Sequence, residues 1–226
     1  MPWLLKKTLA VLGFILLGIG VTAYQVPMVA LRAAFHMTTT TAPNFDWLMA
    51  ATTAVAGAIE IGLLLWLYRW RLRRANPLHI GPARLSIGRI GLVVAMYALI
   101  ITANALIMRV GVPQNQQTIN ELEHLWPWTV FVMVLFIGPL AEELVFRGIF
   151  MTLFWTKDNA INTIGAVSCS AVAFGLLHEP HLSWFLVIYT VMGLALGFTY
   201  RRTRDLRWSL ALHLIINLPG ALVAIH

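Results

Sequence analysis

The sequence predicts an all-α fold, a polytopic transmembrane helix bundle, from three observations. Of the 226 residues, 59% are hydrophobic and only 11% are charged, which is unlike the balance of a soluble domain. The mean hydropathy is +0.78. The apolar residues also gather in runs of about 20 residues, the length that crosses a bilayer. We therefore expect residues 1–226 to form a single membrane domain.

Seven segments meet this length rule. They are residues 8–31, 48–68, 88–108, 126–155, 161–179, 184–200 and 208–226. The fourth is long enough to hold a kink or an interfacial turn, which would raise the number of helical pieces to eight. The first three, within residues 1–110, carry no motif, whereas residues 126–226 hold the polar groups that we expect to form a catalytic core.

The N-terminal segment allows two interpretations. Val21-Thr22-Ala23 follows an apolar run and resembles the cleavage site of a signal peptide. Because the apolar character continues to about Leu31, we favour an uncleaved first span.

Lysine and arginine residues predict the orientation. If the seven segments alternate across the membrane, 13 of the 16 Lys and Arg residues fall on one side, and such loops favour the cytoplasm. We therefore expect an integral, multi-pass membrane protein with a cytoplasmic N-terminus and the lipid bilayer as a partner. The net charge of +7 is explained by topology, so no nucleic-acid partner is expected. Residues 38–46 and 114–123, on the opposite side, are expected to be polar loops.

Residues 137–150, IGPLAEELVFRGIF, place three ionisable groups inside an apolar segment. Such groups are costly in a bilayer and usually mark function. Glu143 and Arg147 have the four-residue spacing at which an acid and a base meet on a helix. Glu142 points in a different direction from Glu143, so we expect it to face a water-filled cavity, where a general base could act. The alternative is one buried ion-pair network formed by all three.

A proline precedes this charged pair. Pro139 has no amide hydrogen and disturbs the carbonyl four residues earlier, which is that of Leu135. We therefore expect a kink that could open a cavity beside Glu142.

Two later segments carry further polar side chains. His178 ends the fifth segment, and His213 and Asn217 lie four residues apart on one face of the seventh. Each alone is compatible with a packing or interfacial role, since polar side chains also join helices in membranes. Together with Glu142 they are the least lipid-compatible groups of three spans, which favours one shared site.

These residues, in this order, resemble the CPBP family of intramembrane endopeptidases, the CAAX-processing and bacteriocin-processing proteases also called the Abi family. The family pattern is EExxxR, then FxxxH, then HxxxN or HxxxD. It is matched here by Glu142 to Arg147, Phe174 to His178 and His213 to Asn217. The resemblance covers residues 136–218. It implies hydrolysis of a peptide bond in a membrane-associated protein or peptide, with a CAAX-like, leader or bacteriocin-type substrate.

The resemblance also implies roles for the motif residues. Glu142, with His178, would activate a water molecule as general base. His213 and Asn217 would donate hydrogen bonds to the developing oxyanion. The supporting residues would be Glu143, Arg147 and Phe174.

Two alternatives stay open. The family has also been described as metalloproteases, so zinc bound by Glu142, His178 and His213 is a rival mechanism. We favour a mechanism without a cofactor, because there is no HExxH helix and Asn217 has a clearer purpose as an oxyanion donor. The second functional hypothesis is a non-catalytic family member that acts in bacteriocin immunity or as a partner of other membrane proteins.

Counting along the spans raises a difficulty of depth. Glu142 falls near the middle of its segment, His178 near the outer end and His213 near the inner end. Either the spans are strongly tilted and offset, or the loop after His178 dips into the bundle, which is tolerated where backbone lines a cavity.

Three other polar residues lie near the motifs or in the spans. Glu60, in the second segment, either faces the cavity or pairs with Arg147, or else lies near a span end in contact with water. Glu179 and His181 flank the second motif, and we expect both to be solvated loop residues.

Overall fold

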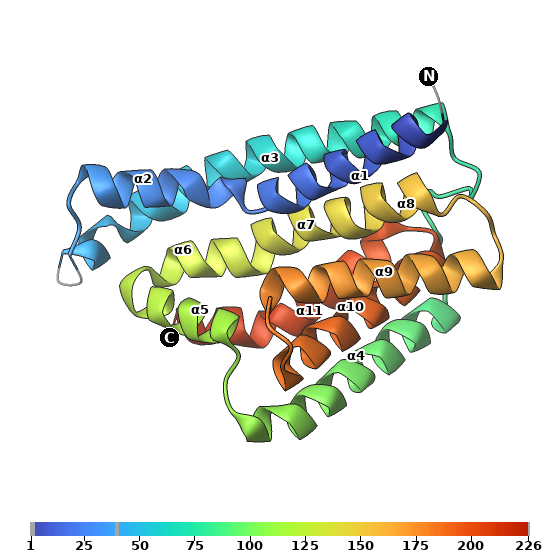
Figure 1. Cartoon of the computed structure of the whole chain (residues 1–226). Helices are drawn as coiled ribbons and strands as arrows, with labels where there is room; N and C mark the ends of the chain where they lie inside the picture. The colour runs from blue at the N-terminus through green and yellow to red at the C-terminus, as the bar shows by residue number, and fades with distance from the viewer. Residues whose placement is uncertain (1–2, 39–40, 226) are drawn as a thin grey trace.

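The computed structural model describes residues 3–38 and 41–225, and within these ranges it contains helices, turns and loops but no strand. Seven helical rods there are long and apolar enough to cross a membrane, which confirms an all-α, multi-pass membrane protein. Figure 1 shows the rods packed side by side. Their bounds are Val11–Ala34, Pro43–Arg74, Ile87–Ile107, Pro127–Phe154, Ala160–His178, Trp184–Thr203 and Leu206–Ala224.

The first rod is broken near its middle. Helix α1 (Trp3–Gly20) is followed by a short 3₁₀ turn, η1 (Ala23–Gln25), and then by α2 (Val26–Ala34). Pro27 stands at the start of α2, where a proline is well tolerated. Because its ring crowds the carbonyl four residues earlier, that of Ala23, the helix is interrupted just before it.

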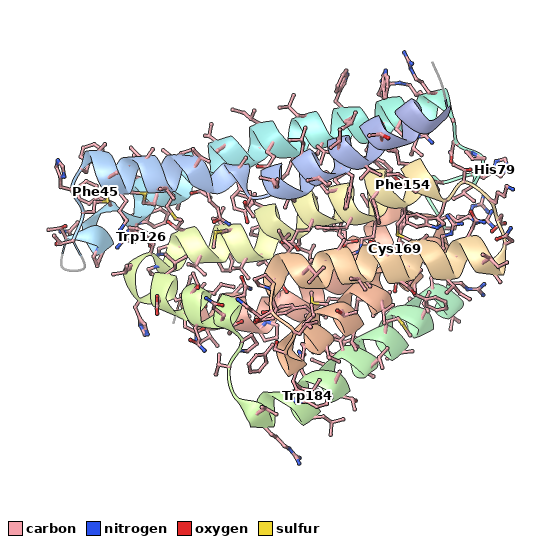
Figure 2. The ribbon with its side chains drawn as sticks, in the orientation of Figure 1. Phe45, His79, Trp126, Phe154, Cys169 and Trp184 are labelled. Atoms are coloured by element: carbon pink, nitrogen blue, oxygen red, sulfur yellow. The ribbon has the colours of Figure 1, made fainter. Side chains whose placement is uncertain are left out.

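Helix α3 (Asp46–Arg74), which follows the 3₁₀ turn η2 (Ala42–Phe45), is tied to the fourth rod at one end. The buried carboxylate of Asp46 accepts hydrogen bonds from the backbone amides of Trp128 and Thr129, at 2.9 and 3.0 Å. These amides lie in the first turn of α6, where backbone donors lack helical partners. Trp126, labelled in Figure 2, is buried beside this junction.

The fourth rod remains one span, but its helical geometry changes four times. It consists of α6 (Pro127–Val132), the π-helical η4 (Met133–Ile137), α7 (Gly138–Glu142), the π-helical η5 (Glu143–Phe150) and α8 (Met151–Phe154). Every residue of η5 is buried. π-turns often occur at functional sites, and here they flank Glu142.

Helices α9 (Ala160–His178) and α10 (Trp184–Thr203) approach each other closely. A Cβ atom on Gly193 would lie 2.7 Å from the Cα atom of Ala171, so only glycine fits at this crossing. Gly197, four residues later, also faces α9. Small residues at this spacing let helix backbones pack together in membranes. Helices α4 (Ile87–Ile107), continued by η3 (Met108–Val110), and α11 (Leu206–Ala224) pack on α10.

The prediction of a polar loop at residues 114–123 is wrong, because this segment forms helix α5 (Gln114–Leu125). Its glutamine, glutamate and leucine residues are good helix formers. None of its residues is buried, but Asn115, Ile119 and Leu122 line a cavity in the bundle. The segment is therefore a polar helix that borders this cavity.

Candidate active site

The structure brings Glu142, His178 and His213 together where α7, the end of α9 and α11 meet. The Nε2 atom of His178 lies 3.8 Å from Oε1 of Glu142, and Nε2 of His213 lies 3.7 Å from Oε2 of the same carboxylate. Both distances are too long for a direct hydrogen bond, and the three side chains line one cavity, from which a water molecule can contact them. One carboxylate thus faces two imidazoles across a narrow gap.

The offset of the rods explains how Glu142, His178 and His213 can meet although they lie at different heights along their own spans. Figure 1 shows that α9 ends alongside α7, so His178, the last residue of α9, lies near the middle of the fourth rod. His213 of α11 lies at the same level, since its Nε2 atom is 3.7 Å from Oε2 of Glu142. Of the two explanations considered, the displacement of the spans is the one that the structure shows.

Each histidine is held by one ring nitrogen and presents the other to Glu142. The Nδ1 atom of His178 lies 2.9 Å from the carbonyl oxygen of Phe174. Because a carbonyl oxygen only accepts, this nitrogen carries the hydrogen. The Nδ1 atom of His213 lies 3.2 Å from Oε1 of Glu143 and donates to it in the same way. Both Nε2 atoms are therefore directed toward the Glu142 carboxylate.

Glu143 and Arg147 form a fully buried ion pair, with Nη1 of Arg147 3.0 Å from Oε1 of Glu143. Nη2 of Arg147 also donates to the carbonyl oxygen of Gly193 on α10, at 3.3 Å. Glu143 thus contacts Arg147 and His213 through the same oxygen. Glu142 is linked to this pair through His213, whose two ring nitrogens face Glu142 and Glu143, but unlike Glu143 it lines the cavity.

Asn217 lies one helical turn after His213, and its side chain is bound to the fourth rod. Its Nδ2 atom donates to the carbonyl oxygen of Val134 at 3.0 Å. The π-turn explains why this carbonyl is available. In a π-helix each carbonyl accepts from the amide five residues later, as in the bond from the Gly138 amide to the Met133 carbonyl. The amide that would bond the Val134 carbonyl is therefore that of residue 139. This residue is a proline and has no amide hydrogen. The prediction that the Pro139 ring disturbs the Leu135 carbonyl assumed α-helical spacing, whereas in the π-turn the carbonyl that lacks its helical donor is that of Val134.

Two aromatic rings enclose the His178 imidazole. Phe174 lies on one side, with ring centroids 4.4 Å apart, and Tyr189 of α10 is stacked at 4.7 Å. Phe174 also lies under the Arg147 guanidinium, at 4.5 Å. Sequence reasoning missed Tyr189, because no motif marks it and only the crossing of α9 and α10 places it here.

One cavity of about 430 Å³, a volume typical of ligand sites, is lined by Glu142, His178, Tyr189, His213 and Asn217. Its wall comes from η1, α4, α5, the fourth rod, α9, α10 and α11. Among the described residues that line it there are two carboxylates, Glu123 and Glu142, and no Lys or Arg. The lining also includes several neutral polar side chains. They are Thr22, Tyr24, Gln25, Asn104, Asn115, Gln116, Thr118, Tyr189 and Asn217.

Glu60 was expected either to face the cavity or pair with Arg147, or to lie near a span end, and the structure shows a different position. It lies midway along α3, is half-buried, and its Oε2 atom accepts a hydrogen bond from the backbone amide of Tyr24 at 2.8 Å. It therefore does not pair with Arg147, does not lie at a span end, and is not among the described residues that line the cavity. The break in the first rod is the reason, since it exposes a backbone amide in front of Glu60.

The prediction that Glu179 is solvated is also wrong, whereas His181 is exposed as expected. The Glu179 amide donates to the carbonyl oxygen of Gly175 at 2.8 Å and continues the last turn of α9. This turn directs the Glu179 side chain inward, while His181 lies beyond it.

The fit of a metal ion can be tested on the same geometry. Glu142, His178 and His213 are ligand types that zinc accepts. In the described parts of the chain, however, no group of three His, Cys, Asp or Glu side chains has the arrangement that could hold a metal ion. We therefore derive no step through a metal.

The comparisons with known proteins concern the part of the chain that contains the candidate site. Residues 124–219 match the family "Type II CAAX prenyl endopeptidase Rce1-like". The match covers less than half of the chain and supports the resemblance to the CPBP family, so residues 124–219 are called the CPBP segment below. The match confirms the resemblance found in the sequence, and it places the candidate site in a segment related to membrane proteases. Every motif residue, from Glu142 to Asn217, lies in this CPBP segment.

Two curated proteins are also similar to the chain. "Putative membrane peptidase YdiL" of Bacillus subtilis is 31% identical over 104 residues, which are 46% of this chain and 40% of that protein. "UPF0177 protein YvdC" of Lactococcus lactis is 30% identical over 112 residues, which are 49% of this chain and 41% of that protein. The alignments thus span about two fifths of each relative. No solved structure matches the chain.

Proposed function

We propose that the protein is an intramembrane endopeptidase whose general base is Glu142. The observation that carries the proposal is the position of the Glu142 carboxylate, which lies 3.8 and 3.7 Å from the Nε2 atoms of His178 and His213 at the wall of one cavity. It lies in a cavity within a bundle that spans the membrane. The relation of the CPBP segment to CAAX prenyl endopeptidases supports the same reaction class.

In the proposed reaction a water molecule in the cavity hydrogen-bonds to both Glu142 and His178. Glu142 takes a proton from this water, whose oxygen attacks the carbonyl carbon of the peptide bond. When the carbon–nitrogen bond breaks, the same proton passes to the leaving amine. The hydrogen bond from His178 to the Phe174 carbonyl fixes the ring during both steps.

His213 and Asn217 are proposed to stabilise the oxyanion. One amide hydrogen of Asn217 is bound to Val134, and the second is left for the substrate. His213 can donate through Nε2 once both ring nitrogens are protonated, and the contact with Glu143 supplies the counter-charge. Fixed donors of this kind act strongly where water is excluded.

The substrate in this proposal is a membrane-associated protein or peptide that enters the cavity as an extended segment. CAAX-like, leader and bacteriocin-type peptides are the candidate classes. The N-terminus is proposed to be cytoplasmic, which rests on the distribution of Lys and Arg residues.

Proteolysis by the purified protein in liposomes tests the proposal. The probes are internally quenched peptides, one farnesylated with a C-terminal CAAX sequence and one apolar leader-type peptide. We expect Glu142→Ala and His178→Ala to abolish cleavage, while the exposed control variants Glu121→Ala and His181→Ala retain it. If Glu142→Ala cleaves at the wild-type rate, the site assignment is wrong. If the wild type cleaves neither peptide, the non-catalytic alternative replaces the proposal.

A further inference from the structure

The break in the first rod places the side chain of Tyr24 at the candidate active site. Because the helix is interrupted at η1, the Tyr24 amide has no helical acceptor and donates to Oε2 of Glu60 at 2.8 Å. The contact joins the first rod to the middle of α3. Glu60 is therefore an intramembrane carboxylate bound to backbone, and the Tyr24 side chain projects from the turn that it holds.

Tyr24 lines the same cavity as Glu142 and is 5% exposed. Its hydroxyl oxygen lies 3.4 Å from the position that a Cβ atom would take on Gly138, and Oε1 of Glu142 lies 3.7 Å from the same position. The phenol and the carboxylate thus flank one small space, which is left open because residue 138 has no side chain. No element of the CPBP segment contributes this hydroxyl.

The hydrogen bonds of Tyr24 leave its proton available. Nε2 of Gln25 donates to the Tyr24 hydroxyl oxygen at 3.3 Å, so this oxygen already acts as an acceptor. A phenol has one hydrogen of its own to donate. With the acceptor side engaged by Gln25, that hydrogen can be directed into the cavity beside Glu142.

We propose that Tyr24 is a substrate-binding residue that donates a hydrogen bond to a peptide carbonyl oxygen in front of Glu142, and that Glu60 positions it. The inference rests on the proposed function for the identity of the ligand. It explains why a carboxylate stands in the middle of α3, where a charge is costly. It also assigns a part of the site to the N-terminal spans, which carry no family motif.

Thiol labelling tests the position of Tyr24 without any proteolysis. Cys169 is the single cysteine and lies on the exposed side of α9 (Figure 2), so Cys169→Ala gives a clean background. We expect Tyr24→Cys in this background to react with a charged, water-soluble methanethiosulfonate. The control Leu16→Cys, on the exposed apolar face of α1, should resist the reagent.

The role of Glu60 is tested by measuring the labelling rate of Tyr24→Cys in variants of residue 60. Glu60→Leu removes the acceptor and should slow labelling of Tyr24→Cys about 3- to 10-fold, the factor that one hydrogen bond provides. Glu60→Gln retains an acceptor oxygen, so in this variant Tyr24→Cys should be labelled as fast as in the protein with Glu60. Equal labelling in all three proteins would overturn the positioning role. Failure of Tyr24→Cys to react would show that residue 24 does not face the cavity.

The donor role is tested with the quenched peptides. We expect Tyr24→Phe to lower kcat/KM about 10-fold, the effect of one lost hydrogen bond, with an unchanged unfolding temperature. Tyr97→Phe, on the core-facing side of α4, is the matched control. Glu60→Leu should reduce kcat/KM, whereas Glu60→Gln should have the kcat/KM of the wild type. In the Tyr24→Phe background, Glu60→Leu should reduce kcat/KM little further.

The two hypotheses fail in different ways. Wild-type kcat/KM in Tyr24→Phe would overturn the donor role and leave Glu142 as the proposed base. If the wild type cleaves neither peptide, the proposed function fails, and with it the assigned ligand. The labelling rates then still decide whether Glu60 holds residue 24 at the cavity.

Discussion

The Asn217 side chain supplies the hydrogen bond that Pro139 withholds from the Val134 carbonyl. The 3.0 Å contact joins α11 to the π-turn of the fourth rod, directly beside Glu142. A residue that the family pattern assigns to chemistry therefore also has a structural contact. The two contributions can be separated by experiment.

Replacing Asn217 by alanine should cost both stability and activity. The Val134 carbonyl, which is partly buried, would lose its partner, and we expect a cost of about 1 kcal/mol, the lower end of the range for a buried group. In the Pro139→Ala background an amide hydrogen is restored to the helix, so the same replacement should cost less. Activity should stay low in both backgrounds, because the amide that faces the cavity is absent. Chemical unfolding and peptide cleavage measure the two effects, and equal stability losses would refute the pairing of Pro139 with Val134.

The Glu143–Arg147 ion pair should be far more important for stability than an exposed pair. Removing one partner of a buried pair leaves an uncompensated charge, and Arg147→Leu should cost about 3–5 kcal/mol. The control is Arg204→Leu, because Arg204 pairs with Asp158 at the surface and such pairs contribute about 1 kcal/mol or less. The unfolding free energy of both variants checks this prediction. A loss for Arg147→Leu as small as the control's would contradict it.

Gly138→Ala should impair the site while leaving the bundle folded. The new methyl group would lie 3.1 Å from the Met133 carbonyl oxygen and would enter the space between Tyr24 and Glu142. Displacements of about 1 Å at a reacting group can cost about 100-fold in rate, so we expect kcat to fall at least about 10-fold. Gly62→Ala, where no atom lies within 4 Å of the added carbon, is the control. Wild-type kcat in Gly138→Ala would show that this space is not used.

Asp205, in the connection before α11, should contribute stability that depends on pH. Burial raises the pKa of its carboxyl group, but hydrogen bonds from the Arg207 side chain and from the amides of Ala83 and Arg207 outweigh burial, so the pKa is lowered below 3.8. The stabilisation is therefore present in full above the unfolded pKa and is lost as the pH falls through the lower folded value. Asp205→Asn should be less stable than the wild type at pH 7, and the difference should shrink below about pH 4. A difference that is independent of pH would exclude the ionised form as its cause.

Removal of metal ions should leave peptide cleavage unchanged. The proposed steps use only Glu142, His178, His213 and Asn217, and these side chains do not form a metal-binding cluster in the described residues. Elemental analysis of an active preparation and dialysis against a chelator check this. Stoichiometric zinc whose removal abolishes cleavage would establish the rival mechanism.

The sequence by itself determined the features that depend on local spacing. Apolar run length predicted the seven spans, although residues 114–125 show that a polar segment between spans need not be a loop. The four-residue spacings predicted the Glu143–Arg147 pair and the common face of His213 and Asn217, because helical periodicity alone fixes them.

Only the tertiary structure decided how these faces meet. The offset of α9 brings His178 level with Glu142, and the helix crossings place Tyr189 on its ring. The break at η1 exposes the Tyr24 amide to Glu60, which a uniform span could not have indicated. These relationships depend on the relative displacement of rods and on departures from α-helical geometry. Hydropathy and spacing within one segment carry no information about either.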